Sequence, residues 1–349
     1  MSEYFERCGK MTMVANNRRQ FVKGFSIGVV LTFIALTCNS YYGNQFIQWT
    51  TTRHSNLENG CNHGPAASFR RTEDSNAFSD DNSTADKLRE QVRVLVAIMT
   101  ALKNIETRAQ AVKDTWAKHC SEIIYFSTGE NKKFPTVRLN VPEGMNHLTP
   151  KTMGGFDYMY DHYFNDFDWF MKADDDTYVI MENLRYFLSS QNFSQPVSFG
   201  QHFVLYDGQE YQDGGAGYVL SKESLRRFRH RGNNSKCVKD GAYEDVEMAH
   251  CLESLGVQIV NSKDSQGRSR FHTFVPSVHI HGTYPKFYNH HNRGDNKGID
   301  SMSDYAVSFH RVTPSMMWEL EFYVYHLRPY GICNVKENLE LKNNKSSSN

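Results

Sequence analysis

Three consecutive aspartates, Asp174–Asp176, follow a mostly apolar run at residues 168–173 and constrain the fold more than any other feature of the chain. Adjacent carboxylates repel one another, so such a triplet at the end of a strand favours a bound cation that offsets the charge. Mg²⁺ and Mn²⁺ prefer oxygen ligands and often share them with a diphosphate. The triplet therefore predicts a metal–nucleotide site, and the alternative is a solvated acidic turn.

Apolar segments that alternate with amphipathic ones surround the triplet. Ala109, Val112 and Trp116 lie on one helical face, as do Met248 and Leu252 further along the chain. This alternation predicts an α/β fold with a largely parallel central sheet, whose ligands bind at the carboxyl ends of the strands. The segments expected to be strands are residues 92–99, 122–126, 168–173, 197–200 and 218–220.

The N-terminal region has the pattern of a membrane anchor. Arg18, Arg19 and Lys23 flank an apolar run at residues 24–38, and its aromatic neighbours bring the segment near the length of a membrane span. The positive flank predicts a cytosolic N-terminus and a lumenal body. A cleaved signal peptide is the alternative, but no small-x-small cleavage site follows the run. The short span fits a membrane of the early secretory pathway.

Changes in composition divide the chain into five parts. We expect a cytosolic tail at residues 1–20, a signal-anchor helix at 21–42, a flexible stem at 43–88, a catalytic body at 89–335 and a disordered tail at 336–349. Basic and acidic residues balance at 39 each, so the chain lacks the basic field that would attract nucleic acid.

Five cysteines lie in the part expected to be lumenal and oxidising. They are Cys61, Cys120, Cys237, Cys251 and Cys333. The number is odd, so at least one is free or joins two chains, which allows a homodimer. The sequence leaves the connectivity open, and the first pair that we expect is Cys237 with Cys251.

Four motifs occur in an order that resembles the β1,3-glycosyltransferases of the Golgi. They are DWFMKADDDTY from Asp168, GGAGYVLSK from Gly214, EDV from Glu244 and SFH from Ser308. The stretches VKDTWAKHC, FHTFVPSVH and ELEFYVYHLRPYG narrow the resemblance to the core 1 β1,3-galactosyltransferase family. It covers residues 92–331 and implies a Rossmann-like glycosyltransferase A fold, UDP-galactose as donor and a GalNAc-modified glycoprotein as acceptor.

The resemblance also implies the roles of individual residues on the donor side. Asp174, Asp176 and His310 match the residues that hold Mn²⁺ against the diphosphate, where the ion helps the UDP to leave. The donor UDP-sugar is expected to contact Met99, Glu143, Gly144, Met145, Asn146, Lys151, Asp174, Asp175 and Arg311.

On the acceptor side, the resemblance gives Asp245 the role of the general base that removes the proton from the attacking O3. Glu244 beside it is expected to be a helix-start carboxylate. Tyr211, Gly215 and Tyr288 are expected to face the acceptor.

The chain departs from the family pattern around the acceptor. Tyr288 stands where the family has a tryptophan, Ser301 and Met302 replace a cysteine pair, and Val96 replaces the cysteine that would pair with Cys120. These changes leave two alternatives open, which are a related enzyme with another donor or acceptor and a non-catalytic glycopeptide-binding or chaperone relative.

Overall fold

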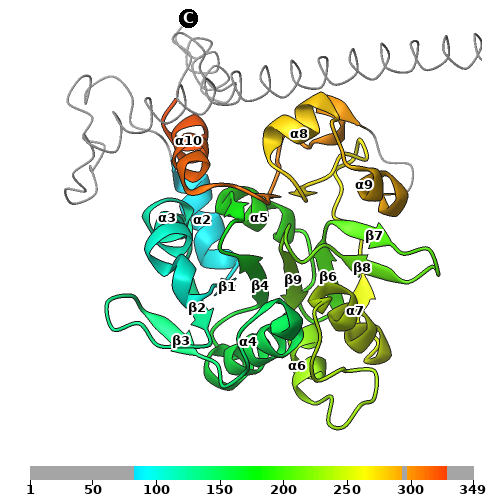
Figure 1. The fold of residues 1–349 in the computed structure, drawn as a ribbon. Coiled ribbons are helices and arrows are strands. Elements are labelled where there is room, and N and C mark those ends of the chain that lie inside the picture. The colour runs from blue at the N-terminus through cyan, green and yellow to red at the C-terminus, as the bar shows by residue number, and fades with distance from the viewer. Residues whose placement is uncertain (1–81, 293–296, 328–349) are drawn as a thin grey trace, which may run out of the picture. The chain divides into compact units, whose positions relative to one another are not determined.

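The computed structural model describes residues 82–292 and 297–327, which belong to one compact unit of the chain, Ser79–Asn349 (Figure 1). The expected cytosolic tail, membrane anchor and C-terminal tail lie outside the described residues. Among the helices that are described, none is long and apolar enough to cross a membrane.

A seven-stranded mixed sheet forms the centre of this unit. Its strand order is β10-β6-β9-β4-β1-β2-β3, and β9 is the strand that runs antiparallel to its neighbours β4 and β6. The largely parallel sheet expected from the sequence is therefore confirmed. The strands are β1 (Val94–Met99), β2 (Glu122–Ser127), β3 (Thr136–Arg138), β4 (Trp169–Asp174), β6 (Val197–Gly200), β9 (Tyr218–Ser221) and β10 (Gln258–Ile259).

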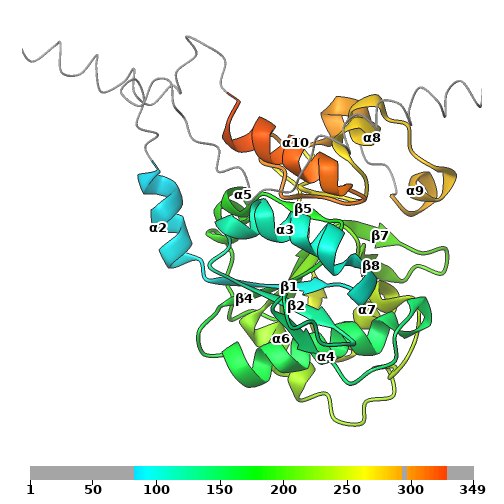
Figure 2. The same ribbon diagram turned by 60° about the vertical axis from the view of Figure 1, so that its left-hand side comes forward.

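Helices cover both faces of the sheet because its inner strands are apolar on both sides. In β1, Val94, Val96 and Ile98 face the hydrophobic core on one side of the sheet, here called the upper core. Leu95 and Ala97 face the core on the other side, the lower core. Figure 2 shows α4 (Leu148–Tyr163) and α6 (Lys222–Arg229) below the sheet, with α3 (Gln110–Asp114), α5 (Met181–Leu188) and α10 (Pro314–Tyr325) above it. Helix α7 (Glu244–Ser254) contributes to the lower core.

Short helices connect these elements. They are the 3₁₀ turns η1 (Leu102–Asn104), η3 (Trp116–His119), η4 (Met145–His147) and η5 (Gly298–Ser301), the π-helical η2 (Ile105–Ala109), and the α-helices α8 (Pro276–His281) and α9 (Lys286–His291).

The structure begins earlier than the predicted boundary between stem and body at residue 88. Helix α2 (Ser83–Gln91) crosses that boundary, and Leu88 packs against the upper core. Arg89 donates a hydrogen bond to the carbonyl of Cys120 at 2.8 Å, which ties the helix to the following domain. Residues 83–88 are mostly polar, so the sequence did not indicate that Leu88 packs against the core.

A second, three-stranded sheet brings the C-terminal part of the chain to the aspartate triplet. Its order is β11 (Phe271–His272), β12 (Ser308–Phe309) and β5 (Tyr178–Val179), and β12 pairs antiparallel with β5. Strand β5 begins two residues after Asp176, and Phe309 pairs with Tyr178, so the residue after β12 lies close to the triplet. A hairpin of β7 (His202–Val204) and β8 (Glu210–Gln212) follows β6 and lies near the end of the large sheet formed by β6 and β10 (Figure 1).

Cys237 and Cys251 form a disulfide, as expected, and Cys120 is a buried free thiol. The bridge joins the loop after α6 to the buried face of α7, and Cys251 is fully buried in the lower core. Such a crosslink stabilises the folded state by restricting the unfolded chain.

Replacing Cys237 by serine is expected to lower the free energy of unfolding by about 2–4 kcal/mol, because the unfolded chain gains the freedom that the bridge removes. Denaturant unfolding of the full chain measures this change. Reductant should destabilise the parent chain to the same level and leave the Cys237→Ser variant unaffected. Equal unfolding midpoints of the parent chain with and without reductant would contradict the structural role of the bridge.

Candidate active site

The aspartate triplet lies at the carboxyl end of β4, where an α/β sheet binds its ligands. Asp174 is the last residue of β4 and pairs in register with Met99, the last residue of β1. The hydroxyl of Thr177 accepts a hydrogen bond from the backbone of Asp174 at 3.2 Å and donates one to the carbonyl of Gly215 at 2.8 Å. The triplet is thus held in a tight turn against the glycine-rich segment.

The middle aspartate of the triplet, Asp175, makes different contacts from Asp174 and Asp176. Asp175 is buried and accepts hydrogen bonds from Thr100 at 2.7 Å and Asn104 at 2.9 Å. Burial raises the pKa of Asp175, and these two hydrogen bonds oppose the rise. Asp175 therefore fastens the turn to the segment after β1. Nη1 of Arg108 lies 3.4 Å from Oδ1 of Asp175 and 3.0 Å from Oδ2 of Asp176, so one guanidinium joins these two carboxylates.

His310 completes the cluster from the far end of the described chain. It follows β12, and its Nε2 lies 3.2 Å from Oδ1 of Asp176. The backbone N–H of Val312 also donates to the carbonyl of Asp176 at 2.9 Å. Burial alone would lower the pKa of His310, but the hydrogen bond to Asp176 and the charge of Asp213 outweigh it and raise the pKa.

Asp174, Asp176 and His310 can hold a metal ion together. One donor atom from each lies within 4.8 Å of the others, and no other such group of three occurs among the residues that the structure describes. Two carboxylate oxygens and an imidazole nitrogen form a donor set that Mn²⁺ accepts. The residues present therefore fit a divalent cation with positions left for a diphosphate.

Two glycines leave the space that these side chains occupy. A Cβ added to Gly215 would lie 2.0 Å from Cε1 of His310, and one added to Gly214 would lie 2.4 Å from Oε1 of Glu244. Both positions therefore require glycine for a steric reason. The groups that approach these two glycines in the structure are protein side chains, and the expected contact of Gly215 with the acceptor stays a prediction.

A buried lysine connects the metal cluster to the helix that carries the expected base. Nζ of Lys172 lies 2.8 Å from Asp174 Oδ1 and 2.9 Å from Glu244 Oε1, and it donates to the carbonyl of Gly214 at 3.0 Å. Burial alone would lower the pKa of Lys172, but the two carboxylates outweigh it and raise the pKa, so the side chain carries a positive charge.

Asp245 lies in the first turn of α7, next to Glu244. Its Oδ2 accepts a hydrogen bond from the backbone of Gly214 at 3.3 Å, and its Oδ1 accepts one from Val246 at 2.9 Å. Burial, together with the charges of Glu244 and Asp213, raises the pKa of Asp245 to about 7. A carboxylate with this pKa suits proton abstraction near neutral pH.

The residues expected to bind the nucleotide lie around the end of β1. Lys151 is buried and donates from Nζ to the carbonyl of Thr100 at 2.6 Å, and Nζ lies 4.0 Å from Glu143. Burial lowers the pKa of Lys151. The neighbouring Met145 is 74% exposed, so this loop lies at the surface. Gly144 in the same loop has a φ of +128°, a conformation that favours glycine. Asn146 is exposed beside them.

Arg311 differs from this group in position. Its guanidinium lies 5.1 Å from the centre of the Phe274 ring, and its φ of +61° is the one positive value of a non-glycine residue in the described part of the chain. This backbone conformation follows directly from the turn that places His310 against the triplet. Its expected contact with the donor stays a prediction.

The tyrosines expected at the acceptor are buried. Tyr288 is 3% exposed, stacks on Tyr284 and meets Phe203 edge-on. Tyr211 is 7% exposed, and its hydroxyl lies 2.8 Å from Nδ1 of His291. Both rings belong to one aromatic cluster that joins the β7–β8 hairpin to α9, so neither presents an open face in this conformation.

Sequence reasoning missed the central role of Lys172 and treated Glu244 as a helix-start carboxylate. Glu244 does begin α7, but it is also buried, and it pairs with Lys172 and accepts from the hydroxyl of Tyr218 at 3.3 Å. One signal was available, because Lys172 is a charged residue inside an otherwise apolar strand, and buried charges are almost always paired.

Replacing Gly215 by alanine is expected to displace the imidazole of His310 and to weaken divalent-cation binding by about 10-fold or more. Titration of the full chain with Mn²⁺, followed by electron paramagnetic resonance of the free ion, measures this affinity. Gly154→Ala is the matched control, since its new Cβ would meet Leu139 at an ordinary 3.6 Å. Unchanged affinity in the Gly215 variant would remove His310 from the ligand set.

Comparisons with known proteins identify the family to which the chain belongs. The Fringe-like family model matches residues 89–293, which is more than half of the chain. A glycoprotein-N-acetylgalactosamine 3-beta-galactosyltransferase 1 of Xenopus laevis is 39% identical over 257 residues, which cover 72% of this chain and 71% of that protein. A beta-1,3-glucosyltransferase of Mus musculus is 31% identical over 172 residues, covering 48% of this chain and 35% of that protein.

Among solved structures, a galactosyltransferase in complex with donor and acceptor sugar analogues is 11% identical, with a TM-score of 0.38. The match covers 67% of this chain and 97% of that one, and the likeness is too distant to support a conclusion. The family match and the related sequences show the family of the chain without it. The chain belongs to the Fringe-like family, and it is a glycosyltransferase.

Proposed function

We propose that this glycosyltransferase transfers galactose from UDP-galactose to O3 of GalNAc on serine or threonine of glycoproteins, with Mn²⁺ as cofactor and inversion at the anomeric carbon. The observation that carries the proposal is the cluster of Asp174, Asp176 and His310, linked through Lys172 and Gly214 to Asp245. The galactosyltransferase of Xenopus laevis supports the choice of sugars.

In this proposal, one set of residues assists the leaving group and Asp245 activates the nucleophile. Asp174, Asp176 and His310 would hold Mn²⁺, which would offset the negative charge that develops on the departing UDP. Lys172 keeps Asp174 oriented from the buried side. Asp245 takes the proton from O3 of the acceptor as that oxygen attacks the anomeric carbon. A single displacement of this kind converts an α-linked donor into a β-linked product.

We also infer a glycosyltransferase A fold and a type II anchor at residues 21–42 that holds the catalytic body in the lumen of the Golgi. The positive flank of that segment and its short length support this orientation and location. A homodimer fits the odd number of lumenal cysteines.

A second candidate function is a β1,3-glycosyltransferase with another donor or acceptor. The burial of Tyr211 and Tyr288, together with the departures from the family pattern in this region, favours a change on the acceptor side. A non-catalytic relative has less support, because the chain keeps both the candidate metal ligands and the carboxylate at Asp245.

The full chain is expected to form Galβ1,3GalNAc from UDP-galactose and a GalNAc-Ser/Thr peptide with Mn²⁺, and to lose this activity in EDTA. Asp176→Asn should reduce transfer by about 100-fold or more, since it removes the negative charge of a proposed metal ligand. Asp166→Asn, which changes an exposed carboxylate before β4, is the matched control. Transfer that persists in EDTA would exclude the metal-dependent mechanism, and transfer of a different sugar would select the second candidate.

The rate constant kcat/KM is expected to rise with pH and to level off above about pH 7, because Asp245 must lose its proton before it can act as a base. Asp245→Asn should lower the rate by about 10²–10⁴-fold and abolish this limb. A pH–rate profile of the full chain gives both values, and an acidic limb centred below pH 5 would assign the base elsewhere.

The same pKa gives a stability change of known sign. Between the ordinary aspartate pKa of 3.8 and about 7, the folded protein keeps a proton on Asp245 that the unfolded chain has lost. The contribution of this group to stability therefore falls as pH rises through that window. Asp245→Asn should accordingly unfold at higher denaturant concentration than the parent chain at pH 8.

A further inference from the structure

The glycine-rich turn between β8 and β9 is held mainly by side chains from other parts of the chain. Three consecutive carbonyls of this turn, those of Gly214, Gly215 and Ala216, each accept a hydrogen bond from such a side chain. In the same order, the donors are Nζ of Lys172 at 3.0 Å, the hydroxyl of Thr177 at 2.8 Å and the hydroxyl of Ser308 at 2.6 Å. Backbone carbonyls inside a protein need partners, and here β4, the residue after the triplet and β12 supply them.

The three donors are buried, but they differ in what else they contact. Lys172 also pairs with the carboxylate of Asp174, and the hydroxyl of Thr177 also accepts from the backbone of Asp174. Both therefore serve the metal cluster as well as the turn. Among the contacts of the described residues, the hydroxyl of Ser308 makes its hydrogen bond to Ala216 and no other. The side chain of Ser308 is thus dedicated to the turn.

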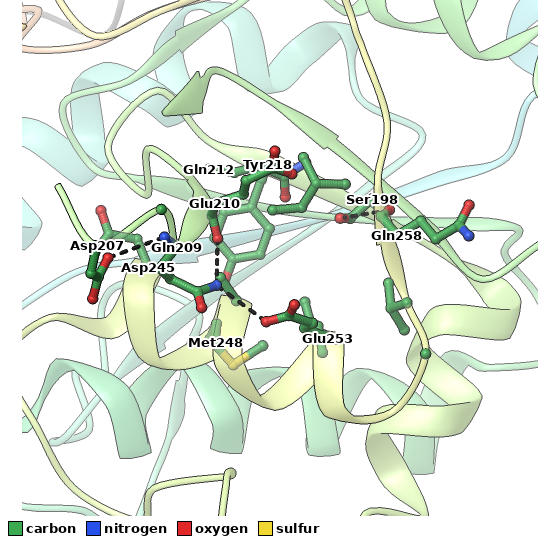
Figure 3. Close-up of a pocket in the computed structure, with 16 residues that line it drawn as sticks. Ser198, Asp207, Gln209, Glu210, Gln212, Tyr218, Asp245, Met248, Glu253 and Gln258 are labelled. Carbon is green, nitrogen blue, oxygen red and sulfur yellow. Dashed lines mark hydrogen bonds between the residues drawn. The ribbon is translucent and has the colours of Figure 1, made fainter. Parts of the chain in front are cut away.

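The turn in its place holds the proposed base. The N–H of Gly214 donates to Oδ2 of Asp245 at 3.3 Å, and this hydrogen bond favours the ionised carboxylate. Asp245 also borders a cavity of about 700 Å³ that is lined in part by α7 and the β7–β8 hairpin (Figure 3). Residues 214–217 do not line this cavity, so the turn can hold Asp245 without closing the cavity beside it.

We infer that Ser308 is a positioning residue of the active site, whose hydroxyl fixes the glycine-rich turn so that the N–H of Gly214 holds the carboxylate of Asp245. The inference deepens the proposed function and rests on it, since it assumes that Asp245 is the base. It gives Ser308 a role on the side of the nucleophile, whereas His310, two residues later, belongs to the side of the leaving group. Strand β12 and the residue after it thereby reach both halves of the site.

The variant that tests this role is Ser308→Ala, which removes the hydroxyl and keeps the backbone pairing of β12 with β5. A turn that is held less firmly supports the ionised Asp245 less, so the acidic limb of kcat/KM should move up by about 0.5–1 pH unit. At pH 6, kcat/KM should therefore fall by about 3- to 10-fold, and it should recover above about pH 9. The titratable groups that face Asp245 all remain in the variant, and they are Glu244, Asp213, Tyr211 and Tyr218.

Ser224→Ala is the matched control. Ser224 is equally buried, and its hydroxyl donates to the carbonyl of Val197 at 2.8 Å, at the start of β6 and away from the turn. This variant should keep the acidic limb where it is in the parent chain. The Mn²⁺ affinity of Ser308→Ala, measured by electron paramagnetic resonance of the free ion, should equal that of the parent chain. A loss of affinity as large as that of Gly215→Ala would assign Ser308 to the metal cluster and overturn the inference.

Hydrogen–deuterium exchange followed by mass spectrometry separates this inference from the proposed function. The peptide that contains residues 213–218 should exchange about 10-fold faster in Ser308→Ala than in the parent chain or in Ser224→Ala. Faster exchange without galactose transfer by the parent chain would support the hold of Ser308 on the turn and reject the proposed reaction. Equal exchange in the parent chain and in Ser308→Ala, or a kcat/KM that falls by the same factor at every pH, would overturn the inference.

Discussion

The buried ammonium group of Lys172 is the interaction on which the arrangement of the site depends. It contacts the carboxylate of Asp174 in the candidate metal cluster, a carboxylate of α7 and a carbonyl of the glycine-rich turn, which belong to three separate segments of the chain. A buried charge that loses its partner costs about 3–5 kcal/mol, so each of these groups keeps the others in place. The positions of Asp174 and Asp245 are thereby coupled.

Much of the fold could be predicted because its signals are local. The apolar runs at residues 92–99 and 168–173 form β1 and β4, and serine and glycine stand where helices begin and end: Ser221 caps α6, and Gly256 has a positive φ after α7. The helix expected across residues 109–116 is less regular, because Thr115 leaves the helical conformation with φ −114° and ψ −115°. The α-helical part is the short α3, with the π-helical η2 before it and the 3₁₀ turn η3 after it. Its apolar face is nevertheless buried as the spacing predicted.

The sequence indicated the candidate metal ligands better than the residues that hold them in position. The family resemblance placed His310 with the triplet, and the pairing of β12 with β5 is the physical reason that the two lie together. The orientation of Asp175 away from Asp174 and Asp176 depends on Thr100 and Asn104, which no local pattern links to it. The burial of Tyr288 likewise results from the aromatic cluster that forms between the hairpin and α9.

The position of β12 near the end of the described chain has a consequence for how the enzyme is made. Every strand of the central sheet precedes residue 260, so a growing chain can complete that sheet and bury Lys172 well before His310 has been synthesised. Domains fold as their sequence emerges. The nascent chain therefore lacks the imidazole of the candidate metal cluster until the C-terminal part has been synthesised. A chain that stops at this stage also lacks Phe271, Phe309 and Met317 of the upper core, so the side of the sheet that they cover stays exposed until the C-terminal part is made.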